Sequence, residues 1–445
     1  MPARTNTIAA IATAQGRGGI GIVRLSGPKS AAIAREILGK TPKPRHAHYT
    51  DFFDQTGTLI DQGILIYFNA PHSYTGEDVL ELQGHGGIAV LQLILQRCLF
   101  LGAQLADPGE FTRRAYLNDK LDLAQAESVS DLIDATTTQA ARSAMRSLKG
   151  EFSTVVNKMI FELVNLRMLV EAMLDFPEED VDQLDEYKRD RQLAHIRDSL
   201  RHTLETAKQG SLLREGAYIA LVGQPNVGKS SLLNCLSGEQ VALVSDVPGT
   251  TRDVIRKEIQ INGIPLHIMD TAGLRESQDS IEMMGIALTH QTLQKADLII
   301  VLRDATRPND AEDEGILAIL PPHIPRLLVL NKIDIDDNIG ARKLSCGVIA
   351  ISAKTGLGIV ALREKLLELV GWNNQESGVF MARERHLIAL REAETKLTRA
   401  ESVLHYPELF AEELRLAQQA LNAITGEFSA DDLLGEIFSR FCIGK

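Results

Sequence analysis

Five short motifs follow one another between residues 223 and 354, in the order that a guanine-nucleotide-binding domain requires. The first is a phosphate loop, Gly223-Gln-Pro-Asn-Val-Gly228-Lys229-Ser230. A phosphate loop alone arises by chance in about one sequence in a hundred of this length. Four further motifs in register make chance negligible, so the sequence predicts a GTP-binding domain. Those motifs are Thr250-Thr-Arg-Asp253, Asp270-Thr-Ala-Gly273, Asn331-Lys-Ile-Asp334 and Ser352-Ala-Lys354.

The first three motifs supply groups that bind phosphates and a magnesium ion. Their glycines let backbone N–H groups turn toward phosphate oxygens, and Lys229 places a charge against the β- and γ-phosphates. Ser230 and Thr251 are expected to give hydroxyl ligands to Mg²⁺, and Asp270 is expected to hold a metal-bound water. A strand is expected at Ala217–Val222 and a helix after the loop. Such a helix N-terminus presents unpaired donors to phosphate.

The fourth and fifth motifs predict selection of guanine. The Asp334 carboxylate is expected to accept hydrogen bonds from N1–H and N2–H₂ of the base, donors that adenine does not present in that pattern. Leaving this carboxylate unpaired costs on the order of several kcal/mol, which disfavours an ATPase. Asn331 is expected to brace the loop, Lys332 to lay its stem on the base, and the Ala353 N–H to meet the guanine oxygen. The strands that bring these loops to one sheet edge are expected at Leu327–Leu330 and Val348–Ile351.

The residue after the Asp-Thr-Ala-Gly motif bears on hydrolysis. Small signalling GTPases place a water-positioning glutamine there, whereas Leu274 can neither orient nor deprotonate water. Glu282 either orients the attacking water or is a solvated glutamate on a helix face, and spacing leaves both readings open. The amide oxygen of Asn226 can bind a monovalent cation in place of an arginine finger. Arg252 and Arg275 are the competing candidates for that finger.

The chain as a whole resembles one protein family. Besides the nucleotide-binding motifs, the segment Gly109–Leu123 and the terminal Phe441-Cys-Ile-Gly-Lys445 are similar to the bacterial tRNA modification GTPases called MnmE or TrmE. Ribosome-assembly GTPases, the competing class, share the nucleotide-binding motifs but not these flanks, and they usually carry a basic RNA-binding module. A pure signalling switch is disfavoured by Leu274 and by the large flanking segments.

The resemblance implies a homodimeric enzyme that hydrolyses GTP when potassium drives dimerisation of its GTPase domains. A flavin-dependent partner similar to MnmG (GidA) would join it in a heterotetramer. Together they would add an aminomethyl or carboxymethylaminomethyl group at C5 of the wobble uridine of certain tRNAs. By the same resemblance, Glu282 matches the catalytic glutamate of the family. The potassium ligands would be Asn226, Ser245, Val247 and Thr250, the last three from the potassium loop at 245–250.

The motifs and the resemblance together predict the contacts with GTP. These contacts are expected from Asn226, Val227, Gly228, Lys229, Ser230, Ser231, Ser245, Asp246, Val247, Pro248, Gly249, Thr250, Thr251, Asp270, Thr271, Ala272, Gly273, Asn331, Lys332, Asp334, Ser352, Ala353 and Lys354.

The composition is consistent with a GTP-binding protein and restricts how it can contact tRNA. The net charge of −12 and the pI of about 5.5 mean that the molecule as a whole does not attract phosphate backbones. Contact with tRNA therefore requires a local basic patch or a basic partner. The four cysteines have no metal-type spacing, and neither a leader nor an apolar run of membrane length is recognisable. A soluble cytoplasmic protein is expected.

The pattern of apolar residues predicts a divided chain. Residues 1–118 carry strand-like runs such as Ile20–Leu25 and Gly63–Phe68. The helical parts are expected at 119–212 and 375–445, with apolar stripes that neither part can bury alone: Met159, Leu163, Leu166, Val170 and Met173, then Leu390, Leu397 and Leu404. The predicted fold is an α/β P-loop GTPase domain (213–374) inserted in an α-helical domain. An α+β N-terminal domain precedes it, and the resemblance makes that domain folate-binding-like.

The first domain contains a misleading glycine pattern, Gly16-Arg-Gly-Gly-Ile-Gly21. β-Branched residues and Gly27-Pro28 follow it, so no helix starts there to receive a pyrophosphate, and an NAD or FAD site is rejected. A turn into a strand that carries Arg24 is expected instead. The resemblance implies that this domain dimerises and binds 5-formyl- or 5,10-methylene-tetrahydrofolate. The folate contacts would be Arg24, Glu81, Lys120 and Lys445, with Cys442 as a candidate redox or catalytic group in the tail.

Overall fold

The computed structural model describes residues 6–14, 16–175, 183–237, 255–270, 293–307, 311–335, 347–373, 378–426, 437–438, 441–442 and 444. The chain divides into two compact units, each of which draws on separate stretches of sequence. The first unit contains Met1–Ile133, Ser147–Arg197 and Glu392–Lys445, and the second contains Asp134–Arg146 and Asp198–Arg391.

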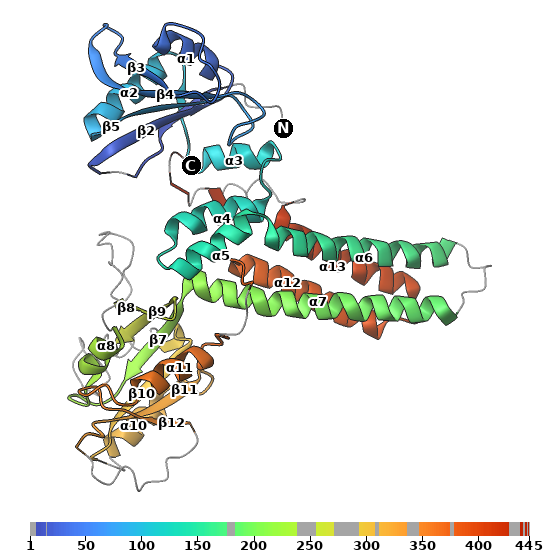
Figure 1. Ribbon diagram of the computed structural model, residues 1–445. Helices are drawn as coiled ribbons and strands as arrows, with labels where there is room; N and C mark the ends of the chain where they lie inside the picture. Colours follow the sequence, from blue (N-terminus) through green and yellow to red (C-terminus); the bar gives the residue numbers. More distant parts are fainter. Residues whose placement is uncertain are drawn as a thin grey trace, which may run out of the picture. The chain divides into compact units, whose positions relative to one another are not determined.

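The first unit begins with an α+β layer in which two helices cover one face of a mainly antiparallel sheet (Figure 1). The sheet order is β3-β4-β5-β2-β1-β6, and only the β1–β6 pair among these described strands is parallel. The elements are β1 (Ile8–Ile11), β2 (Gly18–Ser26), α1 (Ser30–Leu38), β3 (His48–Phe53), β4 (Leu59–Phe68), β5 (Val79–Gly86), α2 (Ile88–Phe100) and β6 (Gln104–Leu105).

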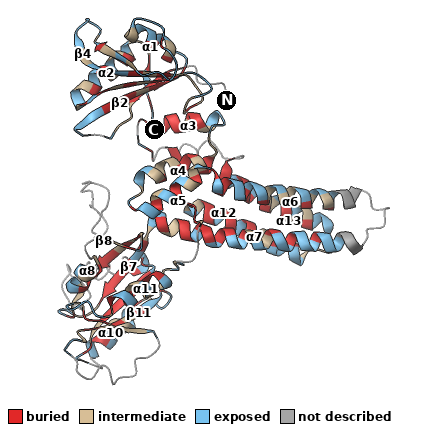
Figure 2. Cartoon of the chain, viewed as in Figure 1, coloured by how far each residue is buried: buried red, intermediate tan, exposed pale blue. Residues whose placement is uncertain are grey.

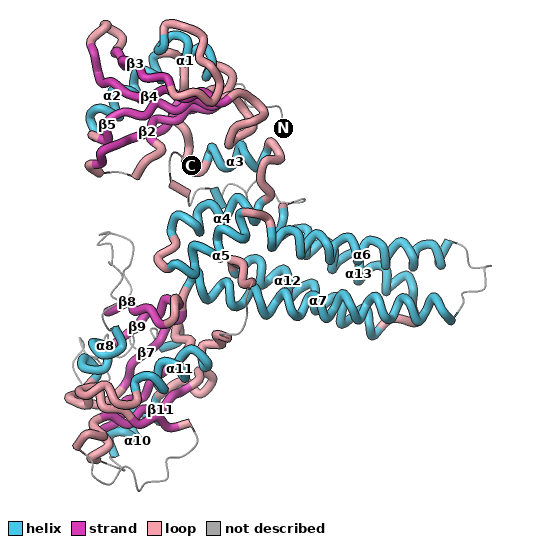
Figure 3. The backbone as a smooth tube through the Cα atoms, in the orientation of Figure 1, coloured by secondary structure: helices cyan, strands magenta, loops and turns pink. Residues whose placement is uncertain are grey.

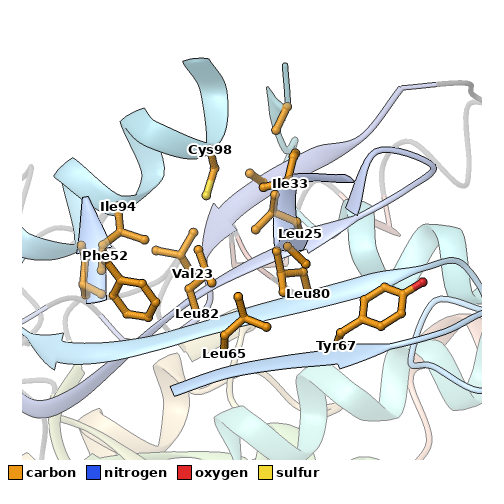
Figure 4. Packing of buried hydrophobic residues seen from close by; sticks show 14 residues of the cluster. Val23, Leu25, Ile33, Phe52, Leu65, Tyr67, Leu80, Leu82, Ile94 and Cys98 are labelled. Atoms are coloured by element: carbon orange, nitrogen blue, oxygen red, sulfur yellow. The ribbon is translucent and has the colours of Figure 1, made fainter. Parts of the chain in front are cut away.

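Alternating apolar residues explain why this sheet packs against its helices. Val23 and Leu25 on β2, with Leu80 and Leu82 on β5, point to the same face and are at most 1% exposed (Figure 4). Cys98 of α2 joins this core, and burial raises the pKa of its thiol to about 12. The predicted turn into a strand is confirmed, because the glycine run leads directly into β2.

Helices from distant parts of the sequence complete the first unit (Figure 3). The helices are α3 (Glu110–Leu117), α4 (Leu123–Asp134), α5 (Thr138–Leu148), α6 (Glu151–Asp175), α7 (Gln183–Glu215), α12 (Glu384–Ser402) and α13 (Pro407–Thr425), of which α4, α5, α7 and α12 extend into the second unit. Helices α6 and α13 lie side by side, and Arg167 Nη1 donates to Gln418 Oε1 at 2.8 Å. Arg197 of α7 pairs with Glu401 of α12. The predicted insertion is confirmed, because the nucleotide-binding motifs lie between these segments in the sequence.

Buried residues run along the helices of this layer (Figure 2), but the two predicted apolar stripes have different outcomes. In α6, the four stripe residues from Met159 to Val170 are at most 2% exposed, as predicted. The side chain of Met173 lies outside the described residues. In the second part, Leu390 and Leu397 are buried within α12, but Leu404 is not in that helix. The predicted repeat is wrong at Leu404, because α12 ends at Ser402 and a new helix begins at Pro407, a residue favoured in a first helical turn.

The second unit is built around a six-stranded sheet with the order β12-β11-β10-β7-β9-β8. Its pairs are parallel except for the β8–β9 hairpin. Strand β10 reads as a continuous apolar run, as expected of a parallel strand covered on both faces. The elements are β7 (Ala217–Val222), α8 (Lys229–Ser237), β8 (Ile255–Ile261), β9 (Ile264–Asp270), β10 (Leu298–Asp304), α10 (Ala311–Ile319), β11 (Arg326–Asn331), β12 (Val348–Ala350) and α11 (Ile359–Leu369).

The predicted strands of the nucleotide-binding sheet are confirmed with small changes at their ends. β7 has the predicted bounds, β11 gains a residue at each end, and β12 ends one residue early. Among the described helices, none is both long and apolar enough to cross a bilayer.

A buried arginine ties α3 to the N-terminal layer. Arg114 is 4% exposed, and its Nη2 lies 2.9 Å from Glu110 Oε1. Its Nη1 lies 3.0 Å from Glu77 Oε2 and donates to the Asn6 carbonyl at 3.0 Å. Glu110 is itself 4% exposed, so the guanidinium neutralises carboxylate charge that water does not reach.

We predict that Arg114→Ala destabilises the protein by about 3–5 kcal/mol, because it removes the cation that compensates buried carboxylates. Urea unfolding followed by circular dichroism measures this loss. The matched control is Arg415→Ala, which breaks an ion pair with Glu412 in which both side chains are half exposed, and it should leave the midpoint nearly unchanged. Equal effects of the two substitutions would contradict the prediction.

Candidate functional site

The phosphate loop connects β7 to α8 in the second unit. Gly223 follows the strand with φ of 158°, and a Cβ there would lie 2.4 Å from the Leu302 carbonyl oxygen. Gly228 has φ of 102°, and a Cβ there would lie 2.3 Å from the Asn331 amide nitrogen. Both positions therefore require glycine. The Lys229 ammonium donates to the carbonyls of Gly223 at 2.5 Å and of Gln224 at 3.0 Å, so it is held across the loop.

Three polar residues of this loop and of the helix after it are exposed. Asn226 adopts a left-handed conformation with φ of 61°, which asparagine tolerates better than most residues, and it is exposed. Ser230 and Ser231 are exposed in the first turn of α8. Their hydroxyls belong to the same first turn as the unpaired N–H groups of the helix, at the positive end of the helix dipole. Amide and hydroxyl oxygens are ligands that suit hard cations such as Mg²⁺.

Asn331 joins three motifs through one side chain. Its Nδ2 donates to the Val227 carbonyl at 2.8 Å, and its Oδ1 accepts from the Ala353 N–H at 2.9 Å. The side chain is buried, with the residue 3% exposed. The register of the sheet explains this meeting, because β7, β10, β11 and β12 are successive parallel neighbours whose carboxyl ends share one edge. The predicted brace is confirmed.

Lys332 is held by a residue that the sequence did not indicate. Its ammonium lies 2.6 Å from Asp304 Oδ2, and its backbone has φ of 69°. Asp304 Oδ1 also accepts from the backbone and hydroxyl of Thr306 at 3.0 and 2.7 Å. Burial alone would raise the pKa of Asp304, but the bonds from Lys332 and Thr306 outweigh it and lower that pKa. The sequence signal for Asp304 is its position, because it is a polar residue at the end of a buried strand, at the sheet edge where ligands bind.

The remaining base-recognition residues lie on loops at the same edge. Asp334 is exposed, and Ala353 is half-buried. Ser352 is fully buried, and its hydroxyl accepts from the Thr355 N–H at 3.1 Å, which shapes the turn that carries Lys354. A cavity of ≈ 120 Å³ lies between the phosphate loop and Lys332, and Asp304 and Arg307 also line it. The structure thus brings the phosphate loop and the guanine motif to one concave site.

Several predicted site residues lie outside the described residues. These are Ser245, Asp246, Val247, Pro248, Gly249, Thr250, Thr251, Thr271, Ala272, Gly273, Glu282 and Lys445, together with Arg252, Leu274 and Arg275. Asp270 ends β9 as predicted, with only its backbone described.

The predicted folate residues divide between two places in the first unit. Arg24 and Glu81 are cross-strand neighbours on β2 and β5, and Arg24 Nη2 lies 2.9 Å from Glu81 Oε1. The Arg24 guanidinium is 5.7 Å from the centre of the Tyr74 ring. Burial raises the pKa of Tyr74. Tyr74 and Lys120 both line an open hollow of ≈ 640 Å³, in which the Lys120 ammonium donates to the Pro71 carbonyl at 3.2 Å.

The described part of the C-terminal tail lies against the same layer. Cys442 is exposed, and its carbonyl accepts from the Gly109 N–H at 3.4 Å. Gly444 has φ of 98°, and a Cβ there would lie 2.4 Å from the Ile11 carbonyl oxygen at the end of β1. Gly444 therefore lies beside the sheet that carries Arg24.

Comparison with known proteins covers nearly the whole chain. A family model described as the MnmE helical domain matches residues 123–442, and a model described as the GTP-binding protein TrmE N-terminus matches residues 7–120. The tRNA modification GTPase MnmE of Nitrosospira multiformis is 57% identical over 450 residues, which cover 99% of this chain and 100% of that protein. MnmE of Chromobacterium violaceum is 55% identical over 442 residues, covering 99% and 98%.

Among solved structures, Aquifex aeolicus Era bound to GDP·AlF4⁻ is 29% identical, covers 40% of this chain and 66% of its own, and has a TM-score of 0.28. The family models and the near full-length identity to MnmE proteins lead to one conclusion. The chain belongs to the MnmE (TrmE) family of tRNA modification GTPases.

Proposed function

We propose that this chain hydrolyses GTP in the course of tRNA modification. The observation that carries the proposal is the Asn331 side chain, which holds the phosphate loop, the guanine motif and the Ala353 loop in one site. Near full-length identity to proteins named tRNA modification GTPases supports the tRNA part. We infer the GTP contacts to be those named from the motifs, and the domains to span 1–118, 119–212, 213–374 and 375–445.

In this proposal, side chains of the five motifs and Glu282 bind and orient the nucleotide and the attacking water. The Lys229 ammonium moves from the carbonyls of its own loop to the β- and γ-phosphates, whose negative charge attracts it more strongly. Asp304 holds Lys332 while Asp334 accepts the two guanine donors. Ser230 and Thr251 would hold Mg²⁺, which neutralises phosphate charge when bound. Glu282 would orient the attacking water in place of the missing glutamine.

Potassium would complete the site through Asn226, whose left-handed backbone turns an exposed amide outward. Ser245, Val247 and Thr250 would supply the other ligands when two GTPase domains dimerise. A positive ion here would take the place of an arginine finger and stabilise charge that develops on the phosphates. The site would then be complete only in the dimer.

We further infer that the homodimer acts with a flavin-dependent partner similar to MnmG, as a heterotetramer, on C5 of the wobble uridine. The group added would be aminomethyl or carboxymethylaminomethyl, with the carbon supplied by 5-formyl- or 5,10-methylene-tetrahydrofolate. The hollow lined by Tyr74 and Lys120, the nearby Arg24–Glu81 pair and the adjacent tail support a folate site. Lys445 would reach this site, and Cys442 is the exposed thiol nearest to it in sequence. The chain would act in the cytoplasm.

We predict that Asp334→Asn weakens GTP binding by on the order of several kcal/mol, because an amide donor replaces the acceptor that faces two guanine donors. Xanthosine triphosphate carries a carbonyl in place of the amino group, so the variant should prefer it. Titration of both nucleotides against native protein and variant measures the reversal. Unchanged GTP affinity in the variant would remove the guanine assignment.

We predict that hydrolysis rises steeply when potassium replaces sodium at fixed ionic strength, and rises with protein concentration. Asn226→Ala should flatten the potassium response while it keeps most nucleotide binding, because the phosphate loop supplies that affinity. Steady-state rates in the two salts, with nucleotide affinity as the control, test this. Equal native rates in both salts would favour Arg252 or Arg275 as an arginine finger.

We predict that Glu282→Ala binds GTP with near-normal affinity but hydrolyses it roughly 10²–10⁴-fold more slowly, the usual cost of losing a group that positions a reactant. Single-turnover rates separate this chemical step from binding. The matched control is Glu276→Ala in the same segment, which should keep the native rate. If Glu282→Ala stays within a few-fold of native, Glu282 is a solvated glutamate.

A further inference from the structure

A groove of ≈ 420 Å³ lies between α6 and α7 in the first unit, away from the residues assigned to any site above. Helix α6 contributes Glu162 and Asn165, and α7 contributes Lys188, Arg191, Gln192 and His195. None of the motifs in the sequence falls on these positions. Five of its seven lining residues carry hydrogen-bond donors, and two of these five are Lys188 and Arg191.

The packing of α7 explains why these side chains share one face. Arg189, Leu193 and Ile196 are at most 8% exposed and turn toward the helical core. Arg189 is fixed there, because its Nη1 donates to the Leu404 carbonyl at 3.3 Å. With that face buried, residues spaced by three and four along the helix are left on the exposed side. Lys188, Arg191 and His195 satisfy this spacing.

The electrostatics of the groove favour an anion. Among the described residues that line it, Glu162 is the only carboxylate. Its Oε1 lies 3.7 Å from His195 Nε2 and 3.9 Å from Lys158 Nζ, so basic groups surround that charge. The amides of Asn165 and Gln192 add donors between the cations. In a chain of net charge −12, such a local basic surface is what contact with a nucleic acid requires.

The spacing of the donors selects the kind of anion. Lys188 and His195 are seven residues apart, which corresponds to about 10 Å along an α-helix. One strand of a nucleic-acid duplex carries a phosphate about every 3 Å along its axis, so this length can face more than one phosphate. A protein partner would instead need an aromatic or aliphatic anchor in the groove. Ile196, the only apolar residue lining it in the described chain, is 1% exposed, so the groove itself offers no such anchor. Phe161 on α6 and Tyr187 on α7 are exposed beside it, so the test below includes a protein partner as an outcome.

We propose that the α6–α7 groove holds consecutive phosphates of the tRNA backbone. The proposal rests on the proposed function in tRNA modification and extends it by naming where this chain touches its substrate. Lys188 and Arg191 bind phosphate oxygens directly, and Asn165 and Gln192 donate to the neighbouring oxygens. Contacts of this kind fix the position of the RNA without reading its sequence. The Glu162 carboxylate repels the phosphates and so lowers the affinity for the RNA backbone.

The test measures binding of an unmodified tRNA transcript to the full-length dimer over a series of KCl concentrations. Lys188→Glu and Arg191→Glu should each weaken binding by about tenfold and reduce the slope of log affinity against log salt by about one. Glu162→Gln should tighten binding several-fold, because it removes a negative charge that faces the phosphates. Damage to the fold cannot produce this gain. Lys208→Glu reverses an exposed charge on the same helix outside the groove and should leave binding near the native value.

The outcomes separate this proposal from the function on which it rests. If native protein binds tRNA but the three groove variants bind equally well, the groove proposal is overturned and the function stands. If the variants keep tRNA binding and lose the flavin-dependent partner in a pull-down, the groove is a protein interface and the RNA proposal is overturned. If native protein binds no tRNA, either alone or together with the flavin-dependent partner, the groove proposal is also overturned. The function itself falls only if cells lacking this chain also keep normal wobble nucleosides.

Discussion

The nucleotide site depends on one buried amide. Asn331 uses its single donor group on the phosphate loop and its single acceptor on the loop of the fifth motif, so three segments far apart in the sequence are held by two hydrogen bonds. A carboxylate of the same shape could not donate, and a hydroxyl could not reach both partners. Glycine at position 228 makes the arrangement possible, because a Cβ would occupy the place of the amide nitrogen. The phosphate loop and the guanine motif are thereby held in a fixed relation to each other.

Much of this organisation could be predicted because it is local. The phosphate loop, the strand before it and the helix after it are encoded within about twenty residues, and spacing alone identifies them. The brace by Asn331 follows from parallel strands that end at one edge. The stripe on α6 follows from helical periodicity, since each residue of that stripe meets the same neighbouring surface.

What could not be predicted depends on contacts between distant residues or on chain reversals without a strong signal. The role of Asp304 in holding Lys332 depends on the sheet register, which brings the two residues together although they are 28 positions apart in the sequence. Leu404 continued the heptad spacing of Leu390 and Leu397, yet the helix ends before it, and only Pro407 hinted at the break. The burial of Arg114 has no local signal, because it depends on Glu77 from another segment as well as on Glu110 of the same helix.

The division of the helical layer also affects how the molecule is made. Arg167 and its partner Gln418 are separated by 251 residues, so α6 leaves the ribosome long before α13 exists. At about 5–20 residues per second, synthesis of the intervening chain takes on the order of tens of seconds. During that interval the stripe from Met159 to Val170 lacks the surface that covers it in the finished protein. The nascent chain is therefore a natural client for a chaperone, and translation that stops before α13 leaves an aggregation-prone product.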